Sequence, residues 1–328
     1  MSTVEQKMYF GTSGIRKGRY YTKKRFNITR KVVAYMTASS WEAIPHCSSI
    51  FEPDVTEIVK EFKKVREESG NSGKLTINTL MIKVFAEALK EATELNSFWR
   101  YNKINSKGTL DIIRNIDVSM PTVVKDGTTS ITMKVKDVGN KSLAQINEYV
   151  YDLRRRAENT NLDELYYQVA LGESLQNLKK GRVVMVIRRL FAGRVGKHKV
   201  HPLTGSAKKE YYKIPETERL CVDDVTQGTL VVSNIGSLIY GKTANQNLTV
   251  SLIEIVPPQT IALGFSGIQE KPGVVINENG EKEIAIRSYM PITIVFDHRP
   301  FDFEALIPFI KKIDDSCTNP EIIAEWMK

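Results

Sequence analysis

A histidine and an aspartate four residues apart, His298 and Asp302, have the residue types and spacing of a general base site near the C-terminus. An imidazole changes charge near neutral pH and can take the proton of an attacking thiol or hydroxyl. Residues 289–296 before the pair predict a buried strand, and residues 302–310 after it predict the start of a helix. Taken alone, the pattern also fits a buried histidine that is hydrogen-bonded to the backbone, so both interpretations stay open.

The elements around this junction are predicted from periodicity and from capping residues. Helices are expected at 29–41 with Thr29 as N-cap, from Asp54 or Thr56 to Val65, from Thr76 onward, and at 143–153. Strands are expected at 112–113, 116–120, 130–135, 228–236 and 259–265, with a hairpin between 274–276 and 284–286 that turns at 277–280. Helices and strands that do not alternate regularly predict an α+β fold with helices on one face of a mixed sheet.

Composition is that of an ordinary globular protein and excludes several classes of function. Of the 328 residues, 41% are hydrophobic and 26% are charged, and no apolar run is long enough for a transmembrane helix. Cys47, Cys221 and Cys317 are scattered, which argues against a disulfide framework or a zinc site and favours the cytoplasm. His198 and His201 lie among lysines and do not predict a metal site. No GxxxxGK phosphate loop is present.

The positive charge belongs to one segment of the chain. Between Lys179 and Lys213 there are eleven basic residues and one acidic residue, Glu210, so this segment carries +10. The chain as a whole carries +9, and the remaining residues therefore sum to 9 − 10 = −1. The segment lies within residues 160–224, which interrupt the pattern of the flanking elements.

Two interpretations of this basic segment stay open. It could be a solvated loop or helical hairpin, or a surface at 179–213 for an anionic membrane, an acyl carrier or the phosphates of coenzyme A. The apolar block 183–187 beside arginines fits an interfacial helix. Nucleic acid is not expected as a partner, because no nucleic-acid-binding motif accompanies the lysines.

Several short motifs, in this order, resemble the catalytic domain of the dihydrolipoamide acyltransferases of 2-oxoacid dehydrogenase complexes. The resemblance implies a two-layer sandwich of the chloramphenicol acetyltransferase type. It covers roughly Arg30 to Lys312. The matching motifs are Arg30–Ala34, Ile44–His46, Asp54–Thr56, Ile77–Lys83, Glu94–Ser97, Lys141–Leu143, Ser233–Gly236, Glu270–Pro272 and Asp297–Asp302.

The resemblance implies roles for four residues. His298 would be the general base, and Ser233 would donate a hydrogen bond to the tetrahedral oxyanion. Asp302 would fix the geometry of the loop and the imidazole, paired with Arg30. In this family the site lies between subunits of a homotrimer, with coenzyme A or acyl-CoA entering from one side and the acyl acceptor from the other. No metal is needed for this chemistry.

The chain departs from the family pattern in three places. Phe303 follows Asp302 where the family usually has glycine, which puts the tightness of that turn in question. Residues 1–28 form an N-terminal arm that is too short for a lipoyl domain, so no lipoyl attachment is expected in this chain. Residues 29–328 are expected to be the catalytic domain, with the basic insertion at about 160–224.

These observations predict an acyltransferase with a thiol or hydroxyl acceptor. One alternative is a stand-alone enzyme whose acceptor is a lipid, a carrier-protein thiol or a small alcohol, acting at a membrane surface. Another is a trimeric scaffold without turnover, which Phe303 favours and the joint presence of His298, Ser233 and Arg30 opposes. Asp297 and His46 are expected to have packing roles.

Overall fold

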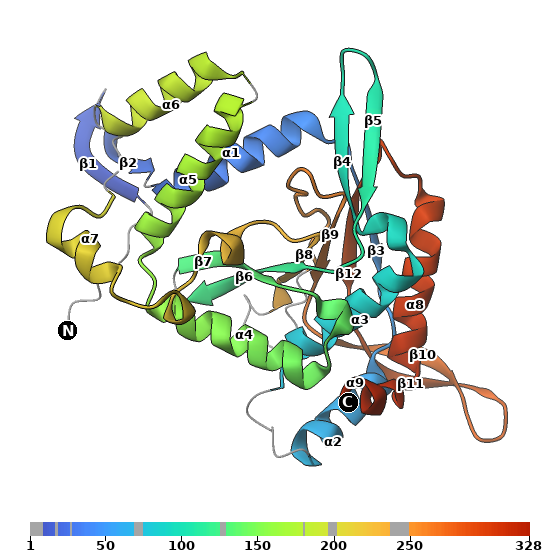
Figure 1. Ribbon diagram of the computed structural model, residues 1–328. Helices are drawn as coiled ribbons and strands as arrows, with labels where there is room; N and C mark the ends of the chain where they lie inside the picture. The colour runs from blue at the N-terminus through green and yellow to red at the C-terminus, as the bar shows by residue number, and fades with distance from the viewer. Residues whose placement is uncertain are drawn as a thin grey trace. The chain divides into compact units, whose positions relative to one another are not determined.

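The chain forms two compact units in the computed structural model (Figure 1). Unit 1 consists of residues 1–39, 122–131 and 152–226, and unit 2 of residues 40–121, 132–151 and 227–328. The predicted boundaries of the arm, the catalytic domain and the insertion stay a prediction. The structure describes residues 9–16, 19–26, 28–68, 75–124, 129–179, 181–195, 202–236 and 249–328.

Helices and strands occur throughout the described ranges. The helices are α1 Ile28–Ala43, α2 Thr56–Glu68, α3 Ile77–Glu91, α4 Leu143–Glu158, α5 Leu162–Lys179, α6 Val183–Arg194, α7 Gly205–Tyr211, α8 Ile307–Thr318 and α9 Ile322–Trp326. The strands are β1 Tyr9–Arg16, β2 Arg19–Phe26, β3 His46–Phe51, β4 Ser97–Asn102, β5 Lys107–Ile112, β6 Val118–Val124, β7 Thr129–Val135, β8 Leu230–Asn234, β9 Ile261–Phe265, β10 Gln269–Ile276, β11 Lys282–Tyr289 and β12 Ile292–Asp297. Short 3₁₀ helices include η4 Val222–Val225 and η6 Phe303–Leu306.

A six-stranded mixed sheet carries the functional region. Its strand order is β3-β12-β9-β8-β6-β7. Strand β12 is antiparallel to β3 and β9, whereas β8 is parallel to β9 and β6. Every residue of β9 and β12 is buried, which explains why both read as continuous apolar runs. The predicted α+β fold with a mixed sheet is confirmed.

Helices α3 and α8 supply the helical layer of unit 2. The hydroxyl of Thr76 caps α3 by accepting a hydrogen bond from the N–H of Thr79, at the helix start that the sequence predicts. Ten residues of α3 are buried, and the ring of Phe85 lies 6.1 Å from that of Phe265 in β9. Helix α8 packs against α3 and α2 (Figure 1). The last strand of the sheet therefore leads into a firmly packed helix.

Most predicted elements are confirmed, and one predicted cap is wrong. The turn at 277–280 joins β10 and β11, with Gly280 at φ +80° and its N–H donating to the carbonyl of Asn277. Thr29 is not an N-cap, because α1 already begins at Ile28 and places it in the first turn. Within the predicted arm, β1 and β2 pair as an antiparallel hairpin that the sequence did not signal.

A partly buried ion pair joins α4 to η4 within unit 1. Nη1 of Arg156 donates to Oδ2 of Asp224 at 2.7 Å, and their side chains are 12% and 4% exposed. The N–H of Cys221 donates to the same carboxylate at 2.9 Å. Burial alone would raise the pKa of Asp224, but these hydrogen bonds outweigh it and hold the pKa below its ordinary value.

The substitution Asp224→Asn is expected to lower the unfolding free energy at neutral pH by about 1–3 kcal/mol, because Arg156 loses its buried partner. A lowered folded-state pKa stabilises the fold above the unfolded-state pKa, and this contribution is lost as the pH falls through the folded-state pKa. Wild-type protein should therefore lose stability below about pH 4, and the variant should lose less. Urea unfolding across this range tests this, with exposed Glu278→Gln as control. The ion-pair account is contradicted if Asp224→Asn has the wild-type unfolding free energy at neutral pH and loses as much of it as wild type at low pH.

Candidate active site

His298 lies directly after buried strand β12 with an ordered imidazole. The backbone N–H of His298 donates to the carbonyl of Pro45. Nδ1 of its imidazole lies 2.9 Å from the carbonyl oxygen of Phe301. Because a carbonyl oxygen only accepts hydrogen bonds, this contact places the hydrogen on Nδ1 and leaves the lone pair on Nε2. The side chain is 37% exposed. The geometry thus presents the unprotonated nitrogen that a general base requires.

Asp302 makes a longer contact with the same imidazole. Its Oδ1 lies 3.5 Å from Nδ1 of His298, and its side chain is 81% exposed. The Phe301 carbonyl, which is closer, therefore orients the ring more directly than the carboxylate does. Arg30 lies in unit 1, where its guanidinium stands over the ring of Phe26 at 6.0 Å. Its predicted pairing with Asp302 stays a prediction.

The turn that carries His298 is fixed by its neighbour Asp297. This carboxylate is fully buried and accepts from the backbone N–H and the Nε of Arg299 at 3.0 and 2.9 Å. The guanidinium of Arg299 also lies over the ring of Tyr101 at 5.5 Å. The expected packing role of Asp297 is confirmed, whereas the contact with Tyr101 was not foreseen from the sequence.

Phe303 stands edge-on beside the imidazole. Its ring meets that of His298 at 5.9 Å and that of Phe296 at 5.1 Å, both with an interplanar angle of 83°. The side chain remains 48% exposed. Phe303, where the resemblance implies glycine, is thus an apolar neighbour of the histidine ring.

Ser233 lies near the end of β8, opposite Gly264 of β9. The side-chain amide of Asn234 donates to the side-chain oxygen of Asn78 in the first turn of α3. A Cβ on Gly236 would come within 2.2 Å of the backbone nitrogen of Gly267, so only glycine fits there. The serine is therefore held on a strand end that packs tightly against neighbouring backbone.

The sheet register keeps Ser233 and His298 of one chain far apart. In the sheet register, Ser233 is paired with Gly264 of β9, and Gly264 is paired in turn with Thr293 of β12. His298 lies five residues beyond Thr293, and β8 is two strands away from β12. With about 3.3 Å per residue and about 4.8 Å per strand, the separation is roughly 15–20 Å. A single chain does not bring the two residues into one site.

His46 is a packed residue, as predicted. Its Nδ1 lies 2.9 Å from the carbonyl oxygen of Ile44, and its Nε2 accepts from the N–H of Ile255 at 3.2 Å. Its ring stacks on that of Trp41 at 5.5 Å. Both ring nitrogens are used by the backbone, so this histidine has no free base function.

The described ranges hold no cluster of three or more His, Cys, Asp or Glu residues suited to a metal ion. His198 and His201 lie outside the described residues. In the same part of the chain, no helix combines the length and the apolar run that crossing a bilayer requires.

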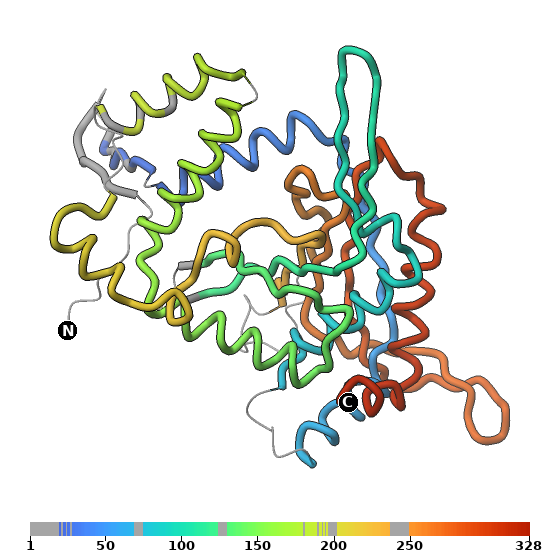
Figure 2. The backbone as a smooth tube through the Cα atoms, in the orientation of Figure 1, coloured from blue at the N-terminus to red at the C-terminus, as the bar shows by residue number. Residues whose placement is uncertain are grey.

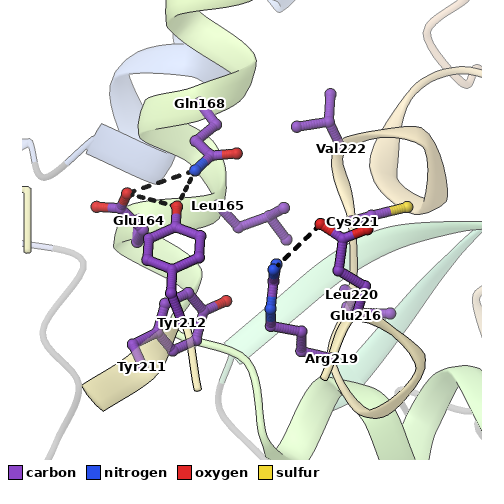
Figure 3. A pocket seen from close by; sticks show the side chains of 10 residues that line it. All are labelled: Glu164, Leu165, Gln168, Tyr211, Tyr212, Glu216, Arg219, Leu220, Cys221 and Val222. Atoms are coloured by element: carbon purple, nitrogen blue, oxygen red, sulfur yellow. Dashed lines mark hydrogen bonds and ion pairs between the residues drawn. The ribbon is translucent and has the colours of Figure 1, made fainter. Parts of the chain in front are cut away.

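Unit 1 contains a small polar cavity of about 210 Å³ (Figure 3). The buried carboxylate of Glu164 accepts from the hydroxyl of Tyr212 at 2.9 Å and from the N–H of Leu203 at 3.2 Å. Burial and this bond to Glu164 raise the pKa of Tyr212 to about 12. The guanidinium of Arg219 lies over the Tyr212 ring at 5.0 Å. These contacts tie α5 to the segment around α7, and no pattern in the sequence indicates them.

Comparison with known proteins decides the family. The model of "2-oxoacid dehydrogenases acyltransferase (catalytic domain)" matches residues 19–167 and 205–324. The chain belongs to this acyltransferase family. The residues between the two matched ranges, 168–204, fall within the predicted insertion.

Curated relatives of this acyltransferase family are distant in sequence. The chain is 23% identical over 295 residues to an Arabidopsis thaliana mitochondrial dihydrolipoyllysine-residue acetyltransferase component of the pyruvate dehydrogenase complex. It is 24% identical over 275 residues to the Bacillus subtilis lipoamide acyltransferase component of the branched-chain alpha-keto acid dehydrogenase complex. These alignments cover 89% and 83% of this chain but 40% and 46% of the relatives. The chain thus spans less than half of each relative.

Solved structures of acyltransferases share the fold. A probable dihydrolipoamide acetyltransferase from Listeria monocytogenes superposes with a TM-score of 0.58 at 22% identity, covering 91% of this chain and 94% of that one. The cubic core of a pyruvate dehydrogenase multienzyme complex gives 0.62 at 17% identity, covering 94% and 95%. The Azotobacter vinelandii dihydrolipoamide acetyltransferase gives 0.60 at 17% identity, covering 92% and 93%.

The substitution Gly236→Ala is expected to lower the unfolding free energy by about 1–3 kcal/mol, because the added methyl group forces the backbone beside β8 to shift. The matched control is Gly172→Ala in α5, where a methyl group meets open space and helix propensity favours alanine by about 0.5–1 kcal/mol. Chemical unfolding of both variants is the measurement. Equal stability of Gly236→Ala and wild type would contradict the close approach of the two backbones.

Proposed function

We propose that the protein transfers an acyl group between coenzyme A and a thiol or hydroxyl acceptor, with His298 as general base. The observation that carries the proposal is the hydrogen bond from Nδ1 to the Phe301 carbonyl, which leaves Nε2 free to accept a proton. The family match supports the reaction class.

In the proposed reaction Nε2 of His298 takes the proton of the acceptor, and the resulting thiolate or alkoxide attacks the thioester carbonyl. The carbonyl π electrons move to oxygen and form a tetrahedral oxyanion. When this intermediate collapses, the bond to the coenzyme A sulfur breaks, and the imidazolium returns its proton to the departing thiolate. The protons balance, and neither a metal nor an acyl-enzyme intermediate is required.

We further propose that Ser233 of a neighbouring copy stabilises this oxyanion. The roughly 15–20 Å between Ser233 and His298 within one chain supports this, since a direct role for both residues then needs two copies. The β10–β11 hairpin supports an interface between copies. Its exposed apolar residues Val274, Ile276, Ile284 and Ile286 are 63–79% exposed, which is unusual for a surface that stays in water. We propose a homotrimer, as the resemblance implies.

Two similar structures support these proposals. The Azotobacter structure concerns the roles of one serine, one histidine and one asparagine in a catalytic mechanism, and the histidine and asparagine are four positions apart. His298 and Asp302 have the same spacing here. We assign Asp302 a positioning role, together with Arg30. The cubic core shows that a protein of this fold can build a larger assembly.

The trimeric scaffold without turnover remains the alternative that a specific residue favours. Phe303 occupies the face of His298 where the family has glycine, and it narrows the approach to the ring. Its 48% exposure and edge-on contact are also compatible with a wall that packs against an apolar part of an acyl acceptor. The acyltransferase function requires His298 for acyl-CoA turnover, whereas the scaffold function does not.

The substitution His298→Ala is expected to lower kcat for acyl transfer from acetyl-CoA or longer acyl-CoAs by about 10²–10⁴-fold, because the base is lost. Ser233→Ala should lower it by about 10²–10³-fold through loss of one oxyanion donor. Release of free coenzyme A in the presence of thiol or alcohol acceptors is the measurement.

Exposed Glu304→Gln, on η6 near the same turn, is the matched control and should keep the wild-type rate. If wild type and His298→Ala give equal background rates with every donor, the proposed catalysis is wrong and the scaffold function is supported.

A further inference from the structure

Helices α5 and α6 form a hairpin with a sharply defined turn. Gly181 has φ +75°, a conformation that favours glycine. Its N–H donates to the carbonyl of Leu178, and the N–H of Arg182 donates to the carbonyl of Asn177, both at 3.0 Å. This pair of bonds is a Schellman ending of α5. Helix α6 therefore folds back beside α5 (Figures 1 and 2).

One face of α6 exposes a stripe of large apolar side chains. Val184, Ile187 and Phe191 follow the helical spacing i, i+3 and i+7 and are 65%, 61% and 67% exposed. Val186, on another face, is only 6% exposed. Leu175 and Leu178 near the end of α5 are 61% and 45% exposed. These five exposed residues, 175, 178, 184, 187 and 191, are together called the apolar stripe of the hairpin.

Cationic side chains surround the apolar stripe. Lys179, Arg182 and Arg188 are exposed. From 174 to 209 the sequence contains ten lysines and arginines and no aspartate or glutamate. An exposed apolar face beside such a run of positive charge has the chemistry of an interfacial helix, whose apolar side enters the acyl region while its cations meet lipid phosphates.

We propose that the α5–α6 hairpin docks on an anionic lipid bilayer through this apolar stripe. A second copy of the chain is a poor occupant, because two surfaces of the same positive charge repel each other. A bilayer with anionic headgroups matches both features at once, the apolar side chains and the cations. The hairpin falls largely in residues 168–204, which the family model leaves unmatched, so docking is an addition to the acyltransferase fold. The inference does not depend on the proposed catalysis.

Flotation with vesicles of phosphatidylcholine alone and with about 30% phosphatidylglycerol tests the inference. Wild-type protein should bind the anionic vesicles at least about tenfold more tightly than the neutral ones. Arg182→Gln with Arg188→Gln should weaken binding about 25-fold, from about fivefold per cation removed. Ile187→Ser with Phe191→Ser should weaken binding to the anionic vesicles at least about tenfold.

Matched controls come from the β4–β5 hairpin. Ile104, which is 98% exposed, is changed to serine, and exposed Lys103 and Lys107 are changed to glutamine. These variants should bind vesicles like wild type. All variants should retain wild-type circular dichroism and wild-type turnover of water-soluble acyl donors, which separates lost docking from lost catalysis or folding.

Three results would overturn the inference. One is equal binding of wild type to neutral and anionic vesicles, or no binding to either. Another is wild-type vesicle binding by both hairpin variants. Binding of an acidic acyl carrier protein without any vesicle binding would likewise overturn it and assign the hairpin to a protein partner.

Discussion

The hydrogen bond between His298 Nδ1 and the Phe301 carbonyl is the interaction on which the proposed chemistry depends. It sets the tautomer, and it leaves the lone pair on Nε2 available to accept a proton. The bond is possible because β12 is buried along its whole length and because Asp297 fastens the following turn through Arg299. Helix α8, packed on α3, holds the chain beyond the turn. The fold thus supplies a rigid support for one polar group.

The same sheet is the basis for the proposal that His298 supplies only half of a site. Strand β9 lies between β12 and β8 in the sheet. The register places the end of β12 that leads into His298 and the end of β8 that carries Ser233 at opposite ends of the sheet. A serine held on β8 and a histidine held after β12 can cooperate only across copies of the chain. We propose different partners for two exposed apolar surfaces, a second copy of the chain for the β10–β11 hairpin and a lipid bilayer for the α5–α6 hairpin.

The sequence predicted those parts of the fold that depend on local patterns. The buried runs of β9 and β12, the start of α3 at Thr76 and the turn at 277–280 all follow from periodicity or turn chemistry. The sequence did not predict contacts that depend on strand order or on distant partners, such as Glu164 with Tyr212, 48 residues away. The sequence also did not predict the Phe301 carbonyl as the partner of His298 Nδ1, because the orientation of the imidazole depends on the path of the turn. Thr29 shows that a cap residue alone does not locate a helix start.

Complementation between two inactive variants measures the central claim most directly. His298→Ala and Ser233→Ala chains, purified separately, are mixed in equal amounts, unfolded and refolded together. If each site takes His298 from one copy and Ser233 from the next, random mixed trimers should recover about one quarter of the wild-type acyl-transfer rate. Each variant refolded alone should stay inactive. A mixture no more active than the separate variants, although mixed trimers are present, would contradict a site shared between copies.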